Sequence, residues 1–191
     1  MRFVRQNVGY QIILKSQKIK MITKKKLIEK CLKIKVIVTD VDGVLTDGGM
    51  YYSKNGEELK KFNTRDGMAF ELLKKNNLKS VIITKENSKI VEKRAHKIKT
   101  DLVFLGIQKK ELELPKICKK LSISNDEILY VGDDINDLEV MKLVGFSACP
   151  NDAVDEIKKN SDYISPFNGG TGVVRELVDL VLSIQNMSKI K

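Results

Sequence analysis

From residue 35 onward, short apolar runs alternate with longer amphipathic segments. Runs rich in β-branched and aromatic residues predict strands at residues 36–39, 80–84, 102–104, 128–131 and 146–148. Between and after them, apolar residues recur at helical spacing and predict helices over residues 68–78, 88–98, 110–121, 137–144 and 173–184. This alternation is typical of a parallel sheet covered on both faces. With right-handed crossovers, the pattern predicts an α/β fold with a Rossmann-like parallel sheet and helices on both faces.

One segment, residues 43–62, interrupts the alternation directly after the first predicted strand. It holds four glycines, and Asn55-Gly56 separates two runs that could pair as strands. Asn-Gly between two such runs is a strong hairpin signal. We therefore predict a β-hairpin flap over this segment. No gap between the predicted elements is long enough for a second domain, so we expect no separate cap domain.

Composition places the chain among ordinary globular proteins. Its 191 residues fit one domain, with 42% hydrophobic and 31% charged residues. No run approaches the roughly 18 consecutive apolar residues that a membrane-spanning helix needs. The three cysteines, Cys31, Cys118 and Cys149, are far apart and odd in number, which argues against a disulfide framework. We expect a reducing compartment, and therefore a cytoplasmic location.

The formal net charge of +10 lies almost wholly at the N-terminus. Residues 1–35 contain 11 basic residues and one acid, while the remainder is balanced with 24 of each sign. The body therefore gives no indication of nucleic-acid or membrane binding. We divide the chain into a basic leader at 1–33, a domain at 34–184 and a tail at 185–191. The leader could be a disordered arm, a segment before a start at Met21, a targeting peptide, or a nucleic-acid- or membrane-binding arm.

Polar side chains collect at the carboxyl ends of the predicted strands. Asp40 and Asp42 follow the first strand, and Thr84 ends the second. Lys110 opens the helix after the third strand, and Asp133 follows the fourth. In open α/β sheets, ligands bind beyond this edge. The sequence therefore predicts one site that gathers acids, a hydroxyl and a lysine.

Two groups of motifs resemble a known family. Residues 40–48 (Asp-Val-Asp-Gly-Val-Leu-Thr-Asp-Gly), Thr84, Lys110 and residues 132–137 (Gly-Asp-Asp-Ile-Asn-Asp) resemble the haloacid dehalogenase superfamily of phosphotransferases. Residues 62–67 and 169–176 are similar, more narrowly, to the 3-deoxy-octulosonate 8-phosphate phosphatase family. That family includes sialic-acid-type 9-phosphate phosphatases and domains linked to cytidylyltransferases. The resemblance covers roughly residues 34–182.

The resemblance implies a Mg²⁺-dependent phosphomonoesterase that works through an aspartyl-phosphate. Asp40 and Asp133, with the Asp42 backbone carbonyl, would hold the metal in a shell of oxygens. Asp40 would attack phosphorus, and Asp42 would act as general acid and then general base. Thr84 and nearby backbone N–H groups would hold phosphoryl oxygens, while Lys110 would supply a cation as charge develops.

Two choices near this site stay open on the sequence. The family pattern favours Lys110 over its neighbour Lys109 as the cation. Asp134 and Asp137 could orient the metal shell, or they could simply cap the start of a helix.

The resemblance also suggests substrate-binding residues: Asn63, Arg65, Asp66, Gly67, Glu86, Arg94 and Lys97. A guanidinium such as Arg65 can grip a sugar carboxylate in a bidentate way; the alternative is a surface arginine before a helix. Arg94 could instead pair with a nearby acid on a solvated face. The family covers its site by tetramer formation, so we expect a homotetramer in which the flap and the 169–172 loop take part.

Position 86 departs from the octulosonate pattern. After Ile83-Thr84 those enzymes typically carry Gly-Arg, whereas this chain has Lys85-Glu86. Glutamate there, with Arg94 and Lys97, resembles the sialic-acid-type branch and modestly favours a nine-carbon substrate. We predict hydrolysis of a phosphorylated 3-deoxy-2-keto sugar acid during the synthesis of a surface sugar such as lipopolysaccharide or sialic acid. The alternative is a non-catalytic module that serves oligomerisation or a cytidylyltransferase partner.

Overall fold

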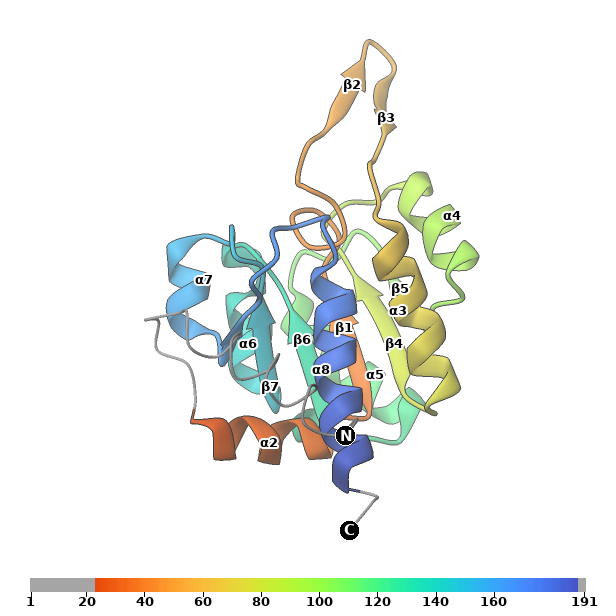
Figure 1. The fold of residues 1–191 in the computed structure, drawn as a ribbon. Helices are drawn as coiled ribbons and strands as arrows, with labels where there is room; N and C mark the ends of the chain where they lie inside the picture. Colours follow the sequence, from red (N-terminus) through yellow and green to blue (C-terminus); the bar gives the residue numbers. More distant parts are fainter. Residues whose placement is uncertain (1–22, 189–191) are drawn as a thin grey trace, which may run out of the picture.

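The computed structural model describes residues 23–188, which are built around one parallel sheet (Figure 1). Its six strands lie in the order β5-β4-β1-β6-β7-β8, and every neighbouring pair is parallel. The strands are β1 Val36–Thr39, β4 Lys79–Ile83, β5 Leu102–Phe104, β6 Ile128–Val131, β7 Phe146–Cys149 and β8 Tyr163–Ile164. The predicted strands are confirmed within a residue or so. The edge strand β8 was missed because two residues carry no readable pattern.

Helices cover both faces of this sheet, as predicted. One face carries α2 Lys24–Lys33, α3 Thr64–Lys75, α4 Lys89–Lys97 and α8 Val173–Ser188; the other carries α5 Leu114–Leu121, α6 Leu138–Leu143 and α7 Asp155–Asn160. Short 3₁₀ turns are η1 Lys110–Glu113, η2 Asn125–Glu127 and η3 Ile135–Asp137. The predicted helix over residues 110–121 is therefore two elements, because Pro115 sits in the first turn of α5, where its missing N–H costs least. No helix within residues 23–188 is long and apolar enough to cross a membrane.

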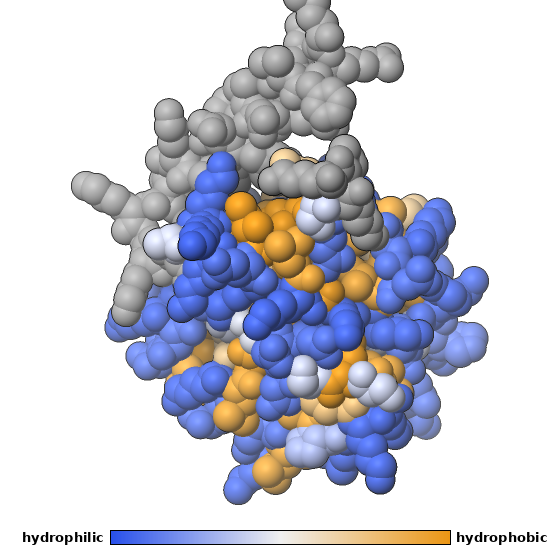
Figure 2. Space-filling model, turned by 90° about the horizontal axis from the view of Figure 1, so that it is seen from below, coloured by the Kyte–Doolittle hydropathy of each residue, from blue (hydrophilic) through white to orange (hydrophobic). Residues whose placement is uncertain are grey.

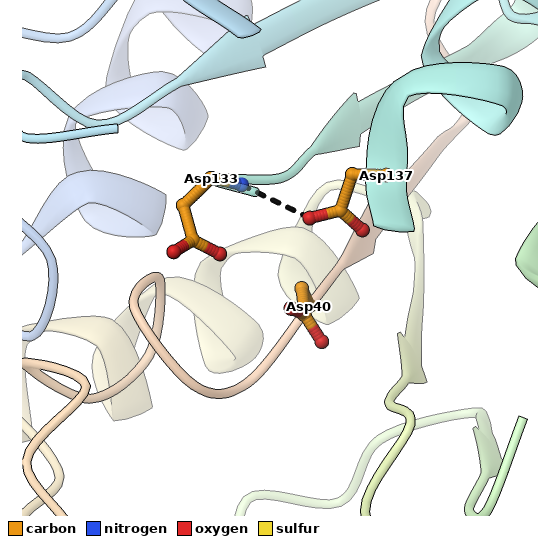
Figure 3. A group of neighbouring side chains, drawn as sticks. All are labelled: Asp40, Asp133 and Asp137. Carbon is orange, nitrogen blue, oxygen red and sulfur yellow. Dashed lines mark hydrogen bonds between the residues drawn. The ribbon is translucent and has the colours of Figure 1, made fainter. Parts of the chain in front are cut away.

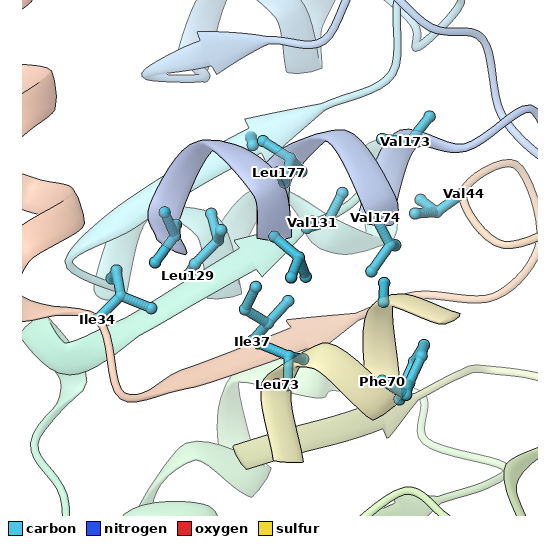
Figure 4. Close-up of a cluster of buried hydrophobic side chains, with 14 of the residues drawn as sticks. Ile34, Ile37, Val44, Phe70, Leu73, Leu129, Val131, Val173, Val174 and Leu177 are labelled. Atoms are coloured by element: carbon cyan, nitrogen blue, oxygen red, sulfur yellow. The ribbon is translucent and has the colours of Figure 1, made fainter. Parts of the chain in front are cut away.

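The central strand β1 contributes to a core on each face of the sheet. Successive side chains of a strand point to opposite faces of the sheet, so that Ile37 joins the hydrophobic cluster on one face while Val36 and Val38 join the cluster on the other. Figure 4 shows Ile37 close to Leu73 of α3, and Leu177 of α8 belongs to the same cluster. All four residues of β1 are buried, which explains why the strand reads as a continuous apolar run.

The predicted flap is confirmed as a two-stranded antiparallel hairpin, β2 Tyr51–Ser53 and β3 Gly56–Leu59. It projects from the edge of the molecule beyond the carboxyl end of β1 (Figure 1). Its apolar side chains are exposed, including Tyr52 and Leu59 at 63% each. Across residues 23–188 the hairpin is the only addition to the sheet and its helices, so the structure shows no cap domain there.

Helix α2 departs from the predicted division of the chain. It lies within the supposed leader, yet Leu27 and Cys31 are buried in the core against α8. The Lys30 ammonium contacts the Gly145 carbonyl and Asp162, each at 2.6 Å, and Gln185 donates to backbone carbonyls at the end of α2. Within the described residues, α2 and the end of α8 therefore pack with the rest of the domain, so that the boundaries proposed at 34 and 184 separate elements that are in contact. The high lysine content masked two buried positions one helical turn apart.

Viewed from below, this end of the molecule is mostly hydrophilic, with separate hydrophobic areas between the charged side chains (Figure 2). Exposed apolar side chains of α2 and α8 include Ile28, Leu32 and Met187. The predictions for residues 1–22 lie outside the described residues.

Candidate active site

Strand pairing brings two distant aspartates together. Strand β1 ends at Thr39, which pairs with Val131 at the end of β6, so that Asp40 and Asp133 leave neighbouring strands at one edge. Carboxylate oxygens of Asp40, Asp133 and Asp137 lie within 4.8 Å of one another. Figure 3 shows the three side chains converging on one region. The prediction that Asp40 and Asp133 lie close enough to share an ion is confirmed.

Gly43 allows the turn after β1 to approach Asp133. Its φ of +86° is unfavourable for residues with a side chain, and a Cβ here would lie 2.0 Å from Asp133 Oδ2. The Asp40-x-Asp42-Gly43 sequence therefore requires glycine for both its backbone conformation and its clearance.

The three clustered carboxyl groups outnumber the ammonium group of Lys110 that lies beside them. Burial, reinforced by the charge of Asp137, raises the pKa of Asp40 to about 7 against the opposing effect of Lys110. Burial and the neighbouring charges of Asp40 and Asp137 raise the pKa of Asp133 to about 8. Oδ1 of Asp133 is buried without a hydrogen-bond donor, whereas Oδ1 of Asp40 is buried beside the Lys110 ammonium. Such a group of buried carboxylate oxygens matches the donor set that a hard divalent cation prefers.

Lys110 is the cation of the site, in agreement with the choice made on the sequence. Its side chain is fully buried, and its ammonium lies 2.9 Å from Asp40 Oδ1 and 2.7 Å from Asp137 Oδ1. Burial lowers the pKa of Lys110, but the attraction of Asp40 and Asp137 outweighs it and leaves the pKa raised. The neighbouring Lys109 is exposed. Lys110 is therefore held as a charged group beside Asp40.

Asp137 orients its neighbours. Besides Lys110, its Oδ1 accepts from the Tyr130 hydroxyl at 2.6 Å, and its Oδ2 accepts from the Asp133 backbone N–H at 3.0 Å. Both oxygens are thus occupied by donors, although their distance from the other acids would permit a metal contact. Asp134 is exposed and caps η3 by accepting from the Ile135 N–H at 2.7 Å, which matches the helix-cap reading.

Asp42 is held by a lysine that the sequence reading missed. The ammonium of Lys60 lies 2.6 Å from Asp42 Oδ1 and 2.5 Å from Glu57 Oε1, and the Lys60 side chain is wholly buried. Burial lowers the pKa of Lys60, but the hydrogen bonds to Asp42 and Glu57 outweigh it, so that the pKa is raised. In the sequence, Lys60 stands beside the exposed Lys61, and nothing in its pattern indicates that it is buried. The one signal that could have singled it out is its position directly after the hairpin.

Thr84 is the hydroxyl at this edge. It follows β4, the other neighbour of β1, and is buried with 2% exposure. Its Oγ1 accepts from the Glu86 N–H at 3.2 Å. The structure thus brings Asp40, Asp42, Thr84, Lys110 and Asp133 to one edge of the sheet, as predicted.

Part of the predicted substrate segment has internal partners. Asn63 caps α3 by accepting from the Arg65 N–H, and its Nδ2 donates to Gly170 O in the 169–172 loop. Asp66 accepts from the Arg175 N–H at the start of α8, and burial raises the pKa of Asp66 to about 6. This buried carboxyl therefore joins α3 to α8, and the substrate role of Asp66 stays a prediction.

Gly67 makes room for Arg94. A Cβ at Gly67 would lie 2.8 Å from Arg94 Nη2, a nitrogen that donates to Asn63 O at 3.0 Å. The Arg94 guanidinium also lies 5.4 Å from the centre of the Phe62 ring. Arg94 is therefore engaged within its own chain, by the Asn63 carbonyl and the Phe62 ring and by the charge of Asp66. Three further predicted substrate residues, Arg65, Glu86 and Lys97, are exposed.

The chain matches a family model described as haloacid dehalogenase-like hydrolase over residues 4–177. It is 38% identical over 159 residues to the 3-deoxy-D-manno-octulosonate 8-phosphate phosphatase of Escherichia coli K12, covering 83% of this chain and 85% of that protein. The Haemophilus influenzae enzyme of the same name is 33% identical over 162 residues, covering 85% and 90%.

Solved structures give the same picture. The Yersinia pestis phosphatase of this name has a TM-score of 0.82 and 33% identity, covering 86% of this chain and 89% of that one. The Moraxella catarrhalis phosphatase, solved with a magnesium ion, a phosphate ion and the sugar acid, has a TM-score of 0.82 and 32% identity, covering 88% and 100%. A cobalt-bound H. influenzae structure has a TM-score of 0.81 and 34% identity, covering 84% and 94%.

Proposed function

The chain belongs to the haloacid dehalogenase-like hydrolases, and from this membership and its site we propose that it is a Mg²⁺-dependent phosphomonoesterase acting on a phosphorylated 3-deoxy-2-keto sugar acid. The observation that carries the proposal is the convergence of Asp40, Asp133 and Lys110 at one edge of the sheet. Relatives that are 38% and 33% identical to this chain are named as phosphatases of one such compound, 3-deoxy-D-manno-octulosonate 8-phosphate.

The residues of the site fit a magnesium ion. Asp40 and Asp133 each present a buried carboxylate oxygen, and burial, together with the like charge of neighbouring acids, raises the pKa of both groups. These two carboxylates, with the backbone carbonyl of Asp42, would hold the ion. When bound, it would neutralise charge on the phosphate and on Asp40, which reduces the repulsion between two anions.

Asp40 acts as the nucleophile in this mechanism. One of its carboxylate oxygens bonds to phosphorus as the bond from phosphorus to the sugar oxygen breaks, and Asp42 gives its proton to that departing oxygen. In the second half, Asp42 takes a proton from water, and that water attacks the aspartyl-phosphate. The bond between phosphorus and Asp40 breaks, which releases inorganic phosphate and restores both carboxyl groups.

Lys110 and Thr84 provide the remaining contacts to the phosphoryl group. Lys110 is buried beside Asp40 with its position fixed by Asp137, so its charge is in place before phosphate arrives. Preorganised charge of this kind stabilises a transition state because no reorientation is needed during the reaction. The Thr84 hydroxyl lies at the end of the strand adjoining β1 and would hold a phosphoryl oxygen.

Two sugar acids are candidate substrates. The eight-carbon 3-deoxy-octulosonate 8-phosphate is favoured by the names of the relatives. Glu86 favours a nine-carbon nonulosonate 9-phosphate, because glutamate at this position resembles the sialic-acid-type branch of the family. An exposed acid in this loop cannot grip the substrate carboxylate, but it can accept hydrogen bonds from sugar hydroxyls. Of the predicted substrate contacts, Arg65, Glu86 and Lys97 have the exposure that such a role needs.

We further propose that the protein assembles as a homotetramer in which hairpins pack together. The exposed Met50, Tyr51, Tyr52 and Leu59 support this proposal, since one short hairpin leaves them in water. Three free cysteines are consistent with a cytoplasmic location.

The proposal is tested with the purified 191-residue chain, Mg²⁺ and each sugar-acid phosphate in turn. Release of inorganic phosphate from either compound supports it, and the two kcat/KM values identify the preferred chain length. Release from neither would contradict the proposal and favour the non-catalytic module. That alternative gives no reason for the buried Lys110 to be held against Asp40.

A further inference from the structure

Lys60 occupies an unusual position for a lysine at the edge of a hairpin. It directly follows β3, and its side chain has 0% exposure. Its ammonium bridges two carboxylates, Asp42 in the turn after β1 and Glu57 on β3. A buried charge is stable only when it is well paired, so this lysine links the two segments firmly.

The bridge is anchored at its far end. Glu57 accepts from the Ser88 hydroxyl at 2.9 Å through its other oxygen, Oε2. Ser88 immediately precedes α4 and is itself 92% buried, with 8% exposure. The chain of contacts from Ser88 through Glu57 and Lys60 to Asp42 therefore joins the base of the hairpin and the start of α4 to the turn that carries Asp42.

The contacts of Asp42 are unequal. Oδ1 lies 2.6 Å from the Lys60 ammonium and 3.4 Å from the Thr46 hydroxyl. Oδ2 is buried and has no hydrogen-bond donor. One oxygen is thus fixed by the protein, and the other is left available to a group that enters the site.

We propose that Lys60 is a positioning residue for the acid–base carboxylate, holding Asp42 by Oδ1 so that Oδ2 exchanges the proton with the sugar oxygen and later with water. This inference rests on the proposed phosphatase activity. It also makes the base of the hairpin part of the catalytic arrangement, because Glu57 of β3 holds Lys60 from the other side.

The test uses two substrates that differ in their need for a proton. The sugar oxygen of 3-deoxy-octulosonate 8-phosphate must be protonated as it leaves, whereas p-nitrophenolate is a weak base and leaves unprotonated. For both substrates, kcat/KM reports steps up to the departure of the leaving group. A lysine that positions the acid should therefore matter for the first substrate and little for the second.

Lys60→Met should lower kcat/KM for the sugar-acid phosphate about 10²-fold, as expected for a displaced general acid, and for p-nitrophenyl phosphate only a few-fold. Lys60→Arg should restore most of the loss. Glu57→Gln, which leaves the lysine in place, should produce the same substrate dependence with a smaller loss. Lys61→Met is the matched control, since Lys61 is exposed and pairs with Asp47; it should change neither value.

Thermal unfolding of each variant accompanies the kinetics, and Glu57→Gln and Lys60→Arg carry the test if Lys60→Met does not fold. Equal losses on the two substrates, or no loss on either, would overturn the inference while leaving the phosphatase activity intact. Failure of the unaltered protein to hydrolyse either substrate would instead overturn the proposed function and this role of Lys60 together.

Discussion

The ammonium nitrogen of Lys110 lies 2.9 Å from Oδ1 of Asp40, although the two residues come from distant parts of the chain. The pair is buried at the carboxyl edge of the sheet, with side-chain exposures of 0% and 6%. The proposed nucleophile and the cation beside it are thus largely shielded from water. The proposed catalysis depends on this pair and on the metal that Asp40 and Asp133 would share.

Replacing the nucleophile should abolish turnover. Asp40→Asn keeps the shape of the side chain but removes the attacking carboxylate, so we expect phosphate release to fall by about 10³-fold or more. The fold should persist, because the substitution also removes one of several crowded buried acids. Phosphate release and thermal unfolding, measured together, check this prediction. Substantial activity in a folded Asp40→Asn variant would rule out Asp40 as the nucleophile.

Asp137 should be needed for both stability and rate. Asp137→Asn would remove the charge that pairs with Lys110 and present an amide N–H₂ to existing donors, so we expect a loss of about 3 kcal/mol in unfolding free energy. The rate should also fall, since Lys110 loses its fixed position. Chemical denaturation gives the stability. Asp134→Asn is the matched control: its exposed side chain caps η3, a role asparagine fills equally well.

The grouping of polar residues at the carboxyl ends of the strands was predictable, because it depends on short apolar runs and the residues that directly follow them. β-Branched runs define the central strands, and parallel strands bring their carboxyl ends to one edge. The sequence alone therefore places Asp40, Thr84 and Asp133 together, as the strand pairing confirms. The choice of Lys110 over Lys109 depended on family resemblance, and the structure agrees with it by burying one and exposing the other.

Partners formed across the fold were not predictable. Lys60 looks like an ordinary surface charge in the sequence, yet it is buried against Asp42. Asp66 was predicted to bind substrate, and nothing in the sequence indicated that it accepts from the Arg175 N–H in the first turn of α8. Helix α2 was hidden by its lysines, since only Leu27 and Cys31 carry its packing. The contacts that bury these residues, Lys60 with Asp42, Asp66 with the start of α8, and α2 with α8, join segments far apart along the chain. Helical or strand periodicity in the sequence gives no information about such contacts.

Position 86 should influence substrate choice. Glu86 is exposed in the loop after β4, so Glu86→Arg can change the site's charge without disturbing the core. An arginine can grip a sugar carboxylate, and we expect the ratio of kcat/KM values to shift toward the eight-carbon substrate, by roughly 10-fold for one such charged contact. Steady-state kinetics with both sugar-acid phosphates measure the ratio. An unchanged ratio would remove position 86 from the account of specificity.

A pH effect on stability should arise away from the site. Burial raises the pKa of Glu176 to about 6 from its usual 4.5, despite the hydrogen bond from Tyr163. The folded protein therefore holds this proton more tightly than the unfolded chain, and stability from this group falls as pH rises from 4.5 through 6. The Glu176→Gln variant has no carboxyl group to ionise here and should not lose this stability. As the pH rises from 4.5 to 7.5, the difference in unfolding free energy between the variant and the unaltered protein should therefore shift by about 1–2 kcal/mol in favour of the variant.

Denaturant unfolding of the two proteins at both pH values measures this difference. Because all other groups titrate alike in both proteins, their contributions cancel. A relative stability that is independent of pH would show that Glu176 ionises in the folded protein as it does in the unfolded chain.

The central claim is that Asp40 and Asp133 hold a magnesium ion on which phosphate release depends. The most direct test measures inorganic phosphate released from 3-deoxy-octulosonate 8-phosphate and from a nonulosonate 9-phosphate, first with excess EDTA and then after Mg²⁺ is restored. We predict negligible release under EDTA and full recovery with Mg²⁺, with Asp133→Asn failing to recover. Equal release with and without the metal, or no release in either condition, would contradict the account.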